Sequence, residues 1–367
     1  MFVNMYFLGD LTVNLKKIGW SPSGAEKKIE VDTVARIISV HRGFCRGITQ
    51  DGDVNVYLTG KFQVQPKSSA NKPAVGDFVR ISPIFIDEQN SHAAALEEIL
   101  TRKTKVSRIA SGREVVEQVL ATNVEFAFIV TSANQDFNIN RLQRYILLAK
   151  EGNVTPVIIL SKIDLVDGAE PFVSEIRDHI GDLEVIPVSS ITDVGLALIR
   201  KKLDQGVTSV FLGSSGVGKS TIVNKLLGEK IQVTKDIRED DSKGRHATTS
   251  RELFFVPNGG MIIDTAGLRE VQVIASKEAV DSTFKNISEL AQTCRFSDCA
   301  HEKEPHCAIN AALEDGTLSE KEYGNYLKLL KEAAFAEKKT SNAKSNTKER
   351  WKTINKNYKA RRKFEGK

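Results

Sequence analysis

The segment TSVFLGSSGVGKSTIVNKLLG, residues 208–228, indicates the fold of the central part of this chain. An apolar run ends at Leu212 and is followed by a segment that fits G-x-x-x-x-G-K-[ST] at every position. Helical periodicity begins directly after the motif. A strand, a glycine-rich turn and a helix in this order place backbone N–H groups and a helix N-terminus around a phosphate. The sequence therefore predicts a nucleotide site in an α/β fold.

The predicted phosphate-binding residues are Gly213, Ser214, Ser215, Gly216, Val217, Gly218, Lys219, Ser220 and Thr221. Within this loop, Lys219 is expected to contact the β- and γ-phosphates, and the Ser220 hydroxyl is expected to bind Mg²⁺.

The surrounding sequence alternates between strand-like runs and amphipathic stretches. The runs are EFAFIVTSA (125–133), TPVIILS (155–161), LEVIPVSS (183–190), ELFFVP (252–257) and GMIIDTAG (260–267). Strands that alternate with helices predict a mostly parallel sheet with both faces covered. Asp264 ends a strand about 45 residues after the phosphate loop, so we expect its carboxylate to hold Mg²⁺ and the Gly267 amide to sense the γ-phosphate.

A second motif predicts which base is bound. Residues 161–164 follow a strand and are similar to N-K-x-D, the guanine-reading pattern of GTPases. Asp164 can accept hydrogen bonds from guanine N1–H and the exocyclic amine, whereas adenine would leave the carboxylate unpaired. Lys162 would lie along the base. The predicted guanine-binding residues are Ser161, Lys162, Ile163, Asp164, Ser189 and Ser190.

The order of the two motifs is unusual. The guanine motif precedes the phosphate loop by about 50 residues, whereas in common GTPases it follows. The same sheet can form if a chain is cut and rejoined elsewhere, because domain termini often lie close together. The sequence therefore predicts a circularly permuted GTPase domain.

The chain before and after this domain has a different character. Residues 31–105 contain short strands broken by turns and predict a small β-barrel; an antiparallel sheet without a binding role is the alternative. The predicted organisation is an N-terminal extension (1–30), a barrel (31–105), a GTPase domain (106–275), a helical module (276–335) and a tail (336–367).

Three of the four cysteines lie within 14 residues, with histidines among them. Three thiolates and one imidazole supply a closed tetrahedral set of ligands, which predicts a structural Zn²⁺ site in the helical module. Free thiols, buried or exposed, are the alternative. Cys45 is far away in sequence and is interpreted as a core thiol of the barrel.

The net charge of +5 averages two unlike parts. Residues 338–367 carry +10, with twelve Lys or Arg against two Glu, so the other residues sum to −5. The tail is expected to order on RNA, or else to stay solvated. No apolar run approaches the roughly 18 residues of a membrane-spanning helix, and residues 1–15 lack the pattern of a signal peptide. We expect a cytoplasmic protein with no membrane partner.

Together these features resemble the RsgA (YjeQ) family of small ribosomal subunit biogenesis GTPases, over about residues 31–335. The resemblance rests on the barrel, the permuted order, GRHATT (244–249) before DTAGL (264–268), and C-x4-C-x-H-x5-C (294–307). It implies an N-terminal OB-type barrel, a circularly permuted P-loop GTPase domain and a C-terminal helical zinc-binding module. It assigns one structural Zn²⁺ to Cys294, Cys299, His301 and Cys307.

The resemblance also implies a function. The protein would act late in assembly of the 30S subunit as a monomer, bind 16S rRNA, and cycle between GTP and GDP. Hydrolysis would be slow alone and stimulated by the subunit, and it would drive release.

Water positioning is the open catalytic question. Leu268 stands where many GTPases carry the Gln that orients the attacking water. The resemblance gives this role to His246, whose imidazole can orient or deprotonate water near neutral pH; the alternative is a surface loop histidine. Thr248 or Thr249 would complete the Mg²⁺ site.

Three residues depart from the family's pattern. Ser161 replaces an Asn, Ala247 a Thr and Ala266 a Pro. Two other functions stay open: a small-molecule kinase or ATPase, which would not explain Asp164 or the barrel, and an RNA-binding protein with a vestigial nucleotide site.

Overall fold

The computed structural model describes residues 14–63, 72–109, 117–228, 251–257, 259–265, 276–302 and 304–335. The residues outside these ranges include the predicted site residues His246, Thr248, Thr249 and Gly267, as well as Leu268 and the tail 336–367. The chain divides into two compact units, one of residues 1–108 and 116–273 and one of residues 109–115 and 274–367.

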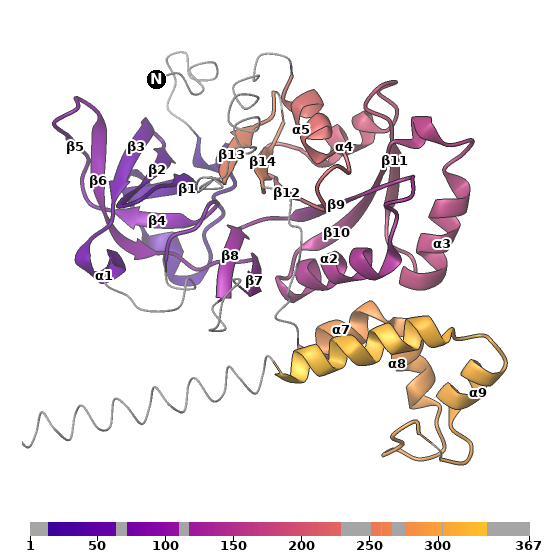
Figure 1. Ribbon diagram of the computed structural model, residues 1–367. Coiled ribbons are helices and arrows are strands. Elements are labelled where there is room, and N and C mark those ends of the chain that lie inside the picture. Colours follow the sequence, from indigo (N-terminus) through magenta and orange to yellow (C-terminus); the bar gives the residue numbers. More distant parts are fainter. Residues whose placement is uncertain are drawn as a thin grey trace, which may run out of the picture. The chain divides into compact units, whose positions relative to one another are not determined.

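The first unit begins with a closed five-stranded barrel (Figure 1). Its strands pair in the order β1-β2-β3-β6-β4, and β4 pairs back with β1. These strands are β1 (Val34–Val40), β2 (Phe44–Thr49), β3 (Gly52–Tyr57), β4 (Phe78–Ile81) and β6 (His92–Ile99), with the short β5 (Phe85–Ile86) paired to β6. Because neighbouring side chains point to opposite faces of a strand, alternate apolar residues fill the interior. The predicted barrel is confirmed.

Cys45 belongs to the barrel core, as predicted. Its side chain is fully buried. It packs with residues such as Val56 of β3 and with Phe62, which lies in the short helix α1 (Gly60–Gln63). Burial raises the pKa of the Cys45 thiol to about 12, so the thiol stays protonated at neutral pH.

The GTPase part is a second group of strands in the order β11-β10-β9-β12-β14-β13. Every pairing among them is parallel except β13 with β14. The strands are β9 (Phe126–Ser132), β10 (Thr155–Ser161), β11 (Val185–Val188), β12 (Thr208–Leu212), β13 (Glu252–Phe255) and β14 (Met261–Asp264). The predicted mostly parallel sheet is confirmed.

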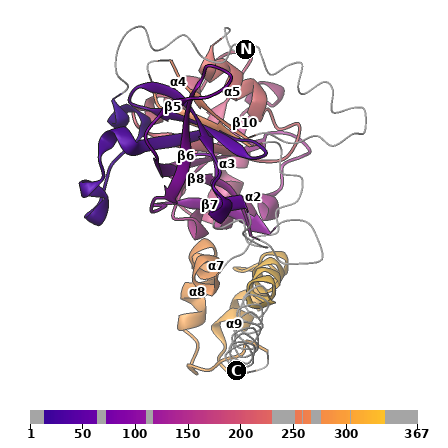
Figure 2. The same cartoon turned by 90° about the vertical axis from the view of Figure 1, so that its left-hand side faces the viewer.

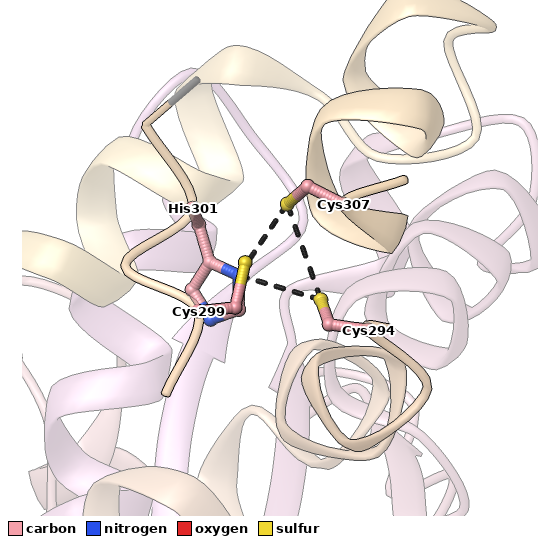
Figure 3. Close-up of side chains that lie close together, drawn as sticks. All are labelled: Cys294, Cys299, His301 and Cys307. Atoms are coloured by element: carbon pink, nitrogen blue, oxygen red, sulfur yellow. Dashed lines mark hydrogen bonds between the residues drawn. The ribbon is translucent and has the colours of Figure 1, made fainter. Parts of the chain in front are cut away.

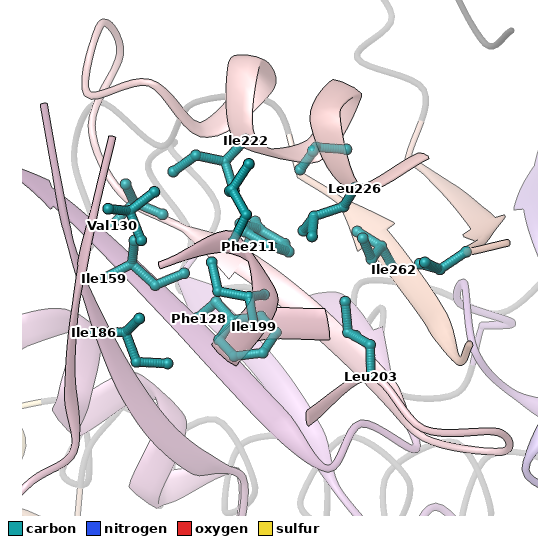
Figure 4. Packing of buried hydrophobic residues seen from close by; sticks show 14 of the residues in the cluster. Phe128, Val130, Ile159, Ile186, Ile199, Leu203, Phe211, Ile222, Leu226 and Ile262 are labelled. Atoms are coloured by element: carbon teal, nitrogen blue, oxygen red, sulfur yellow. The ribbon is translucent and has the colours of Figure 1, made fainter. Parts of the chain in front are cut away.

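Helices cover both faces of this sheet, also as predicted (Figure 1). They are α2 (Ile139–Glu151), α3 (Glu170–Ile180), α4 (Leu196–Lys202) and α5 (Lys219–Leu227). On one face, Phe128 and Phe211 pack with Ile199 of α4 and Ile222 of α5 (Figure 4). On the other, Leu160 packs with Val173 of α3.

The barrel and the GTPase strands form one continuous sheet. Strand β1 pairs with β13 through Ser39 and Glu252. The register continues on both sides, because Arg46 of β2 pairs with Ser39 and Asp264 of β14 pairs with Glu252. One row of residues therefore runs from the barrel surface to the carboxyl edge of the GTPase sheet.

A buried arginine strengthens this junction. The Nη2 atom of Arg36 donates to Thr208 Oγ1 at 2.8 Å and to the Asn123 carbonyl at 3.1 Å. Its Nη1 atom donates to the Ile18 carbonyl and contacts Met261 Sδ at 3.4 Å. The sequence predicted only an extension before residue 31, but the 3-10 helix η1 (Leu15–Ile18) buries apolar side chains and binds this arginine.

The remaining short elements of the first unit are η2 (Gly24–Lys28), η3 (Val31–Thr33), η5 (Ile163–Leu165) and the two-stranded sheet of β7 (Lys105–Ile109) and β8 (Glu117–Thr122).

The second unit contains helices, as predicted (Figure 2). They are α7 (Lys277–Thr283), α8 (Lys285–Gln292), α9 (Ala308–Glu314) and a helical stretch over 320–335. Phe284 is fully buried and its ring lies 5.5 Å from that of Tyr326. The Tyr326 hydroxyl donates to Asp281 Oδ1 at 2.9 Å, which ties the last helix to α7.

Candidate nucleotide site and metal centre

The phosphate loop lies at the carboxyl end of β12, in the middle of the sheet. Gly213 has φ 143° and Gly218 has φ 94°, values that only glycine adopts without strain. A Cβ atom on Gly213 would lie 2.4 Å from the Val130 carbonyl oxygen of β9, so the loop leaves the sheet in contact with the neighbouring strand. The first turn of α5 has no side-chain cap among the described residues, as expected of an anion-binding helix N-terminus.

Lys219 is held against the loop. Its side chain is only 6% exposed. The ammonium donates to the Gly213 carbonyl at 2.7 Å and to the Ser214 carbonyl at 2.5 Å. These two bonds fix the position of the charge that is expected to meet the phosphates.

Asp264 lies beside the phosphate loop. It is the last residue of β14 and pairs with Phe211 of β12, two residues before Gly213. The next residue, Thr265, donates through its hydroxyl to the Phe211 carbonyl at 2.7 Å. The structure thus brings Asp264 to the same carboxyl edge as Ser220, the first-turn residue of α5.

The guanine loop follows the neighbouring strand β10. Ser161 is buried, and its hydroxyl lies 2.6 Å from the Val217 carbonyl of the phosphate loop and 3.1 Å from the Thr131 carbonyl. A hydroxyl has one proton, so Ser161 serves these two carbonyls one at a time, whereas the amide of an Asn carries two N–H donors. The departure from N-K-x-D therefore keeps a contact with the phosphate loop and removes one donor.

The Asp164 side chain is held in place by a hydrogen bond. Lys162 adopts φ 59° and starts η5, which carries Asp164. Asp164 Oδ1 accepts a hydrogen bond of 2.6 Å from the Ser189 hydroxyl, and that hydroxyl accepts the N–H groups of Ile191 and Thr192 at 3.2 Å each. Ser189 thus orients the carboxylate, while the adjacent Ile163 and Ser190 are half-buried.

Sequence reasoning missed one contact to the phosphate loop. Arg141, in the first turn of α2, donates through Nη1 to Ser214 Oγ at 2.8 Å. One feature of the sequence could have indicated this contact. Arg141 lies in a first helical turn that contains no acidic residue, and a cation in that position is disfavoured by the helix dipole.

The second unit holds a compact metal-ligating cluster. The ligand atoms of Cys294, Cys299, His301 and Cys307 all lie within 4.8 Å of one another (Figure 3). Cys294 Sγ lies 3.9 Å from Cys307 Sγ, and His301 Nδ1 lies 3.5 Å from each of these sulfurs. Tetrahedral Zn²⁺ with Zn–S of about 2.3 Å and Zn–N of about 2.0 Å requires S···S of about 3.8 Å and S···N of about 3.5 Å. The donors therefore fit one zinc ion.

Neighbouring N–H groups orient the sulfurs. Asn310 N donates to Cys307 Sγ at 3.5 Å, and Cys307 is the N-cap of α9. Burial alone raises the pKa of the Cys294 thiol, but bonds from the Ala308 and Ile309 amides and from neighbouring thiols outweigh it and lower that pKa below its usual value. These contacts favour the thiolate form of Cys294.

Known proteins resemble this chain in sequence and in fold. A model of the RsgA GTPase family matches residues 99–274. A protein named small ribosomal subunit biogenesis GTPase RsgA from Methanosarcina acetivorans is 40% identical over 333 residues, 90% of this chain and 88% of that protein. The chain belongs to the RsgA GTPase family. A Listeria innocua protein named RsgA 1 is 41% identical over 345 residues, 93% of this chain and 96% of that one.

Two solved structures show the same fold. The crystal structure of YjeQ from Thermotoga maritima matches with a TM-score of 0.59 and 25% identity, over 82% of this chain and 98% of that one. YloQ, described as a circularly permuted GTPase, matches with a TM-score of 0.56 and 26% identity, over 82% and 95%. The predicted family and the permuted fold are confirmed. No helix in the part of the chain that the structure describes is long and apolar enough to cross a membrane.

Proposed function

We propose that this protein hydrolyses GTP as a late assembly factor of the 30S ribosomal subunit, acting in the cytoplasm as a monomer. One observation carries the nucleotide part: Asp164, held by Ser189, lies at the same sheet edge as the phosphate loop. The ribosomal part rests on membership of the RsgA GTPase family and on the names of its relatives.

The nucleotide would lie across the carboxyl edge of the sheet, where strand order reverses between β9 and β12. Residues 213–221 would hold the phosphates, and the guanine loop would bind the base. Ser220 and Asp264, with Thr248 or Thr249, would hold Mg²⁺, and Gly267 would contact the γ-phosphate. When bound, Mg²⁺ supplies charge stabilisation for the transferred phosphoryl group.

Water attack needs an orienting group. Leu268 cannot hydrogen-bond, so we assign this role to His246, in the polar segment 229–250 that leads into β13. A neutral imidazole accepts the proton of the attacking water.

The barrel carries a surface suited to RNA. The His41 and Phe44 rings stack at 4.9 Å, and Tyr57 lies 6.1 Å from Phe44. Burial and the charge of Arg46 lower the pKa of His41, so its ring is neutral at pH 7 and can stack on a base. Arg42 follows His41 directly, is exposed, and supplies positive charge beside these rings. OB-type barrels bind single-stranded nucleic acid in this way, and we assign 16S rRNA to this face.

The zinc ion would be structural, since four protein ligands leave no open position. The tail, with its charge of +10, would add phosphate contacts. The GTP-bound protein must bind the subunit more tightly than the GDP-bound protein does. If the two forms had equal affinity for the subunit, hydrolysis could not drive release.

The decisive experiment measures GTP turnover against added, purified 30S subunits. We expect slow turnover alone and strong stimulation by subunits. His246→Ala should lower turnover at near-normal GTP affinity, and His179→Ala on α3 serves as the matched control. Equal affinity for ATP and GTP would favour a kinase or ATPase, and absent stimulation would favour a vestigial nucleotide site.

The tail is tested separately. Deleting residues 338–367 should weaken subunit binding and flatten its salt dependence, by a log–log slope of about 0.7–0.9 for each phosphate that the tail neutralises. An unchanged slope would contradict a role for the tail in RNA binding.

A further inference from the structure

The placement of Arg141 calls for an explanation. It is the third residue of α2, whose first turn contains no acidic side chain. A cation there faces the positive end of the helix dipole, which is unfavourable. Asn138 already caps the helix by accepting the Arg141 N–H at 2.9 Å, so the Arg141 side chain is not needed to start it.

The arginine side chain is used on the phosphate loop. Arg141 Nη1 donates to Ser214 Oγ at 2.8 Å, over a sequence separation of 73 residues. The Tyr145 hydroxyl, one helical turn further along α2, also hydrogen-bonds Ser214. Tyr145 is only 3% exposed, and burial raises its pKa, against the opposing effects of Ser214 and Arg141. Two side chains from one helix face therefore hold a single serine hydroxyl.

Ser214 connects this pair to Lys219. Its side chain bonds α2, and its carbonyl accepts a hydrogen bond from the Lys219 ammonium. Rotation of the Ser214 backbone would turn that carbonyl away from Lys219. A hold on the Ser214 side chain is therefore also a hold on the lysine.

We propose that Arg141 is a positioning residue for GTP hydrolysis, which acts through Ser214 to fix Lys219 in the phosphate loop. Tyr145 supports the same serine. The inference rests on the proposed role of Lys219 at the β- and γ-phosphates, and it adds a residue outside the sequence motifs to the reaction.

A purely structural role predicts different behaviour. If Arg141 only stabilised the fold, its removal would lower the melting temperature and leave the turnover of folded protein unchanged. If it acted only through its charge, Lys would replace it fully, whereas positioning through a directed N–H bond allows only partial rescue.

The test measures GTP turnover without subunits for the full chain and for Arg141→Ala, Arg141→Lys, Ser214→Ala and the double variant Arg141→Ala/Ser214→Ala. Arg177→Ala on α3, where an exposed arginine pairs with Glu170 at 3.6 Å, is the charge-matched control. Circular dichroism confirms folding, and binding of a fluorescent GDP is measured alongside turnover.

We expect Arg141→Ala to lower kcat/KM for GTP by about 10–100-fold, the scale of a misplaced catalytic group, with a smaller loss of GDP affinity. Arg141→Lys should recover part of the loss. The double variant should be no worse than the poorer single variant, because both remove one link. Three results would each overturn the proposal. They are a turnover of Arg141→Ala within about 2-fold of the Arg177→Ala control, full recovery of turnover in Arg141→Lys, and a double variant whose loss equals the sum of the two single losses in free energy. This assay contains no subunits, so its outcome does not depend on stimulation by subunits. A failure of that stimulation would contradict the proposed function and leaves the result for Arg141 separate.

Discussion

Replacing Arg36 with Met removes the buried cation at the junction of barrel and GTPase sheet. The side chain is 1% exposed and donates to three oxygen atoms, the carbonyls of Ile18 and Asn123 and the hydroxyl of Thr208. Hydrogen bonds from a charged donor contribute about 1.5–3 kcal/mol each, so their loss costs about 4.5–9 kcal/mol.

An opposing effect reduces this loss. Burial lowers the pKa of Arg36 from 12.5 to about 10, despite the nearby charges of Glu125 and Asp77. At 1.36 kcal/mol per pKa unit, keeping the guanidinium charged in this place costs about 3 kcal/mol, which Met does not incur. The net destabilisation is therefore about 1–6 kcal/mol, and we expect about 3 kcal/mol.

Urea denaturation followed by Trp20 fluorescence measures this change. Trp20 is buried, and its ring lies 4.9 Å from the ring of Phe78. The Arg36 guanidinium lies over the same Phe78 ring, so Trp20 is close to the substituted residue. Trp351→Phe removes the second tryptophan of the chain. Arg46→Met is the matched control, because its salt bridge with Asp53 is partly exposed and worth at most about 1 kcal/mol. If the Arg36 variant loses no more stability than this control, the buried hydrogen bonds do not hold the junction.

Three further predictions concern the base, the metal and a buried acid. Asp164→Asn should lower GTP affinity by at least about 100-fold in competition with fluorescent GDP, since two charge-assisted bonds are removed; a change below about 10-fold would argue against this carboxylate as the base reader. Chelation of the metal should remove the helical signal of residues 276–335 and zinc should restore it, with Trp20 fluorescence unchanged; persistence of the helices without metal would contradict a structural ion. Burial raises the pKa of Glu252 despite Arg46, so its ionised form destabilises the folded state increasingly as pH rises above the ordinary value of 4.5. Glu252→Gln should therefore be more stable than wild type at pH 7 but not at pH 4, as measured by urea midpoints, and equal midpoints at both pH values would refute this.

Local motifs made much of the fold predictable. The strand, glycine turn and helix around Lys219 occupy consecutive residues, so their chemistry is visible in a short window of sequence. The same holds for the three clustered cysteines, whose spacing predicts a metal site, whereas the choice of His301 as the fourth ligand came from the family resemblance; the structure brings all four donors together. Alternating strand and helix patterns likewise predicted the parallel sheet.

Long-range contacts could not be predicted in this way. Arg36 meets Thr208 across 172 residues, and Arg141 meets Ser214 across 73. No periodic pattern or motif encodes such pairs, because they depend on where the topology places two elements. The barrel and the GTPase strands pair through one residue pair, Ser39 with Glu252, and no sequence pattern predicts this contact either.

The position of Arg36 has a mechanical consequence. It binds Thr208 and Met261, the first residues of β12 and β14, and the far ends of these strands lead to Gly213 and Asp264. At about 3.3 Å per residue, the five residues of β12 span about 17 Å and the four of β14 about 13 Å. A mechanical force on the barrel is therefore transmitted through Arg36 along the axes of these two strands, to the phosphate loop at the end of β12 and to the Asp264 carboxylate at the end of β14.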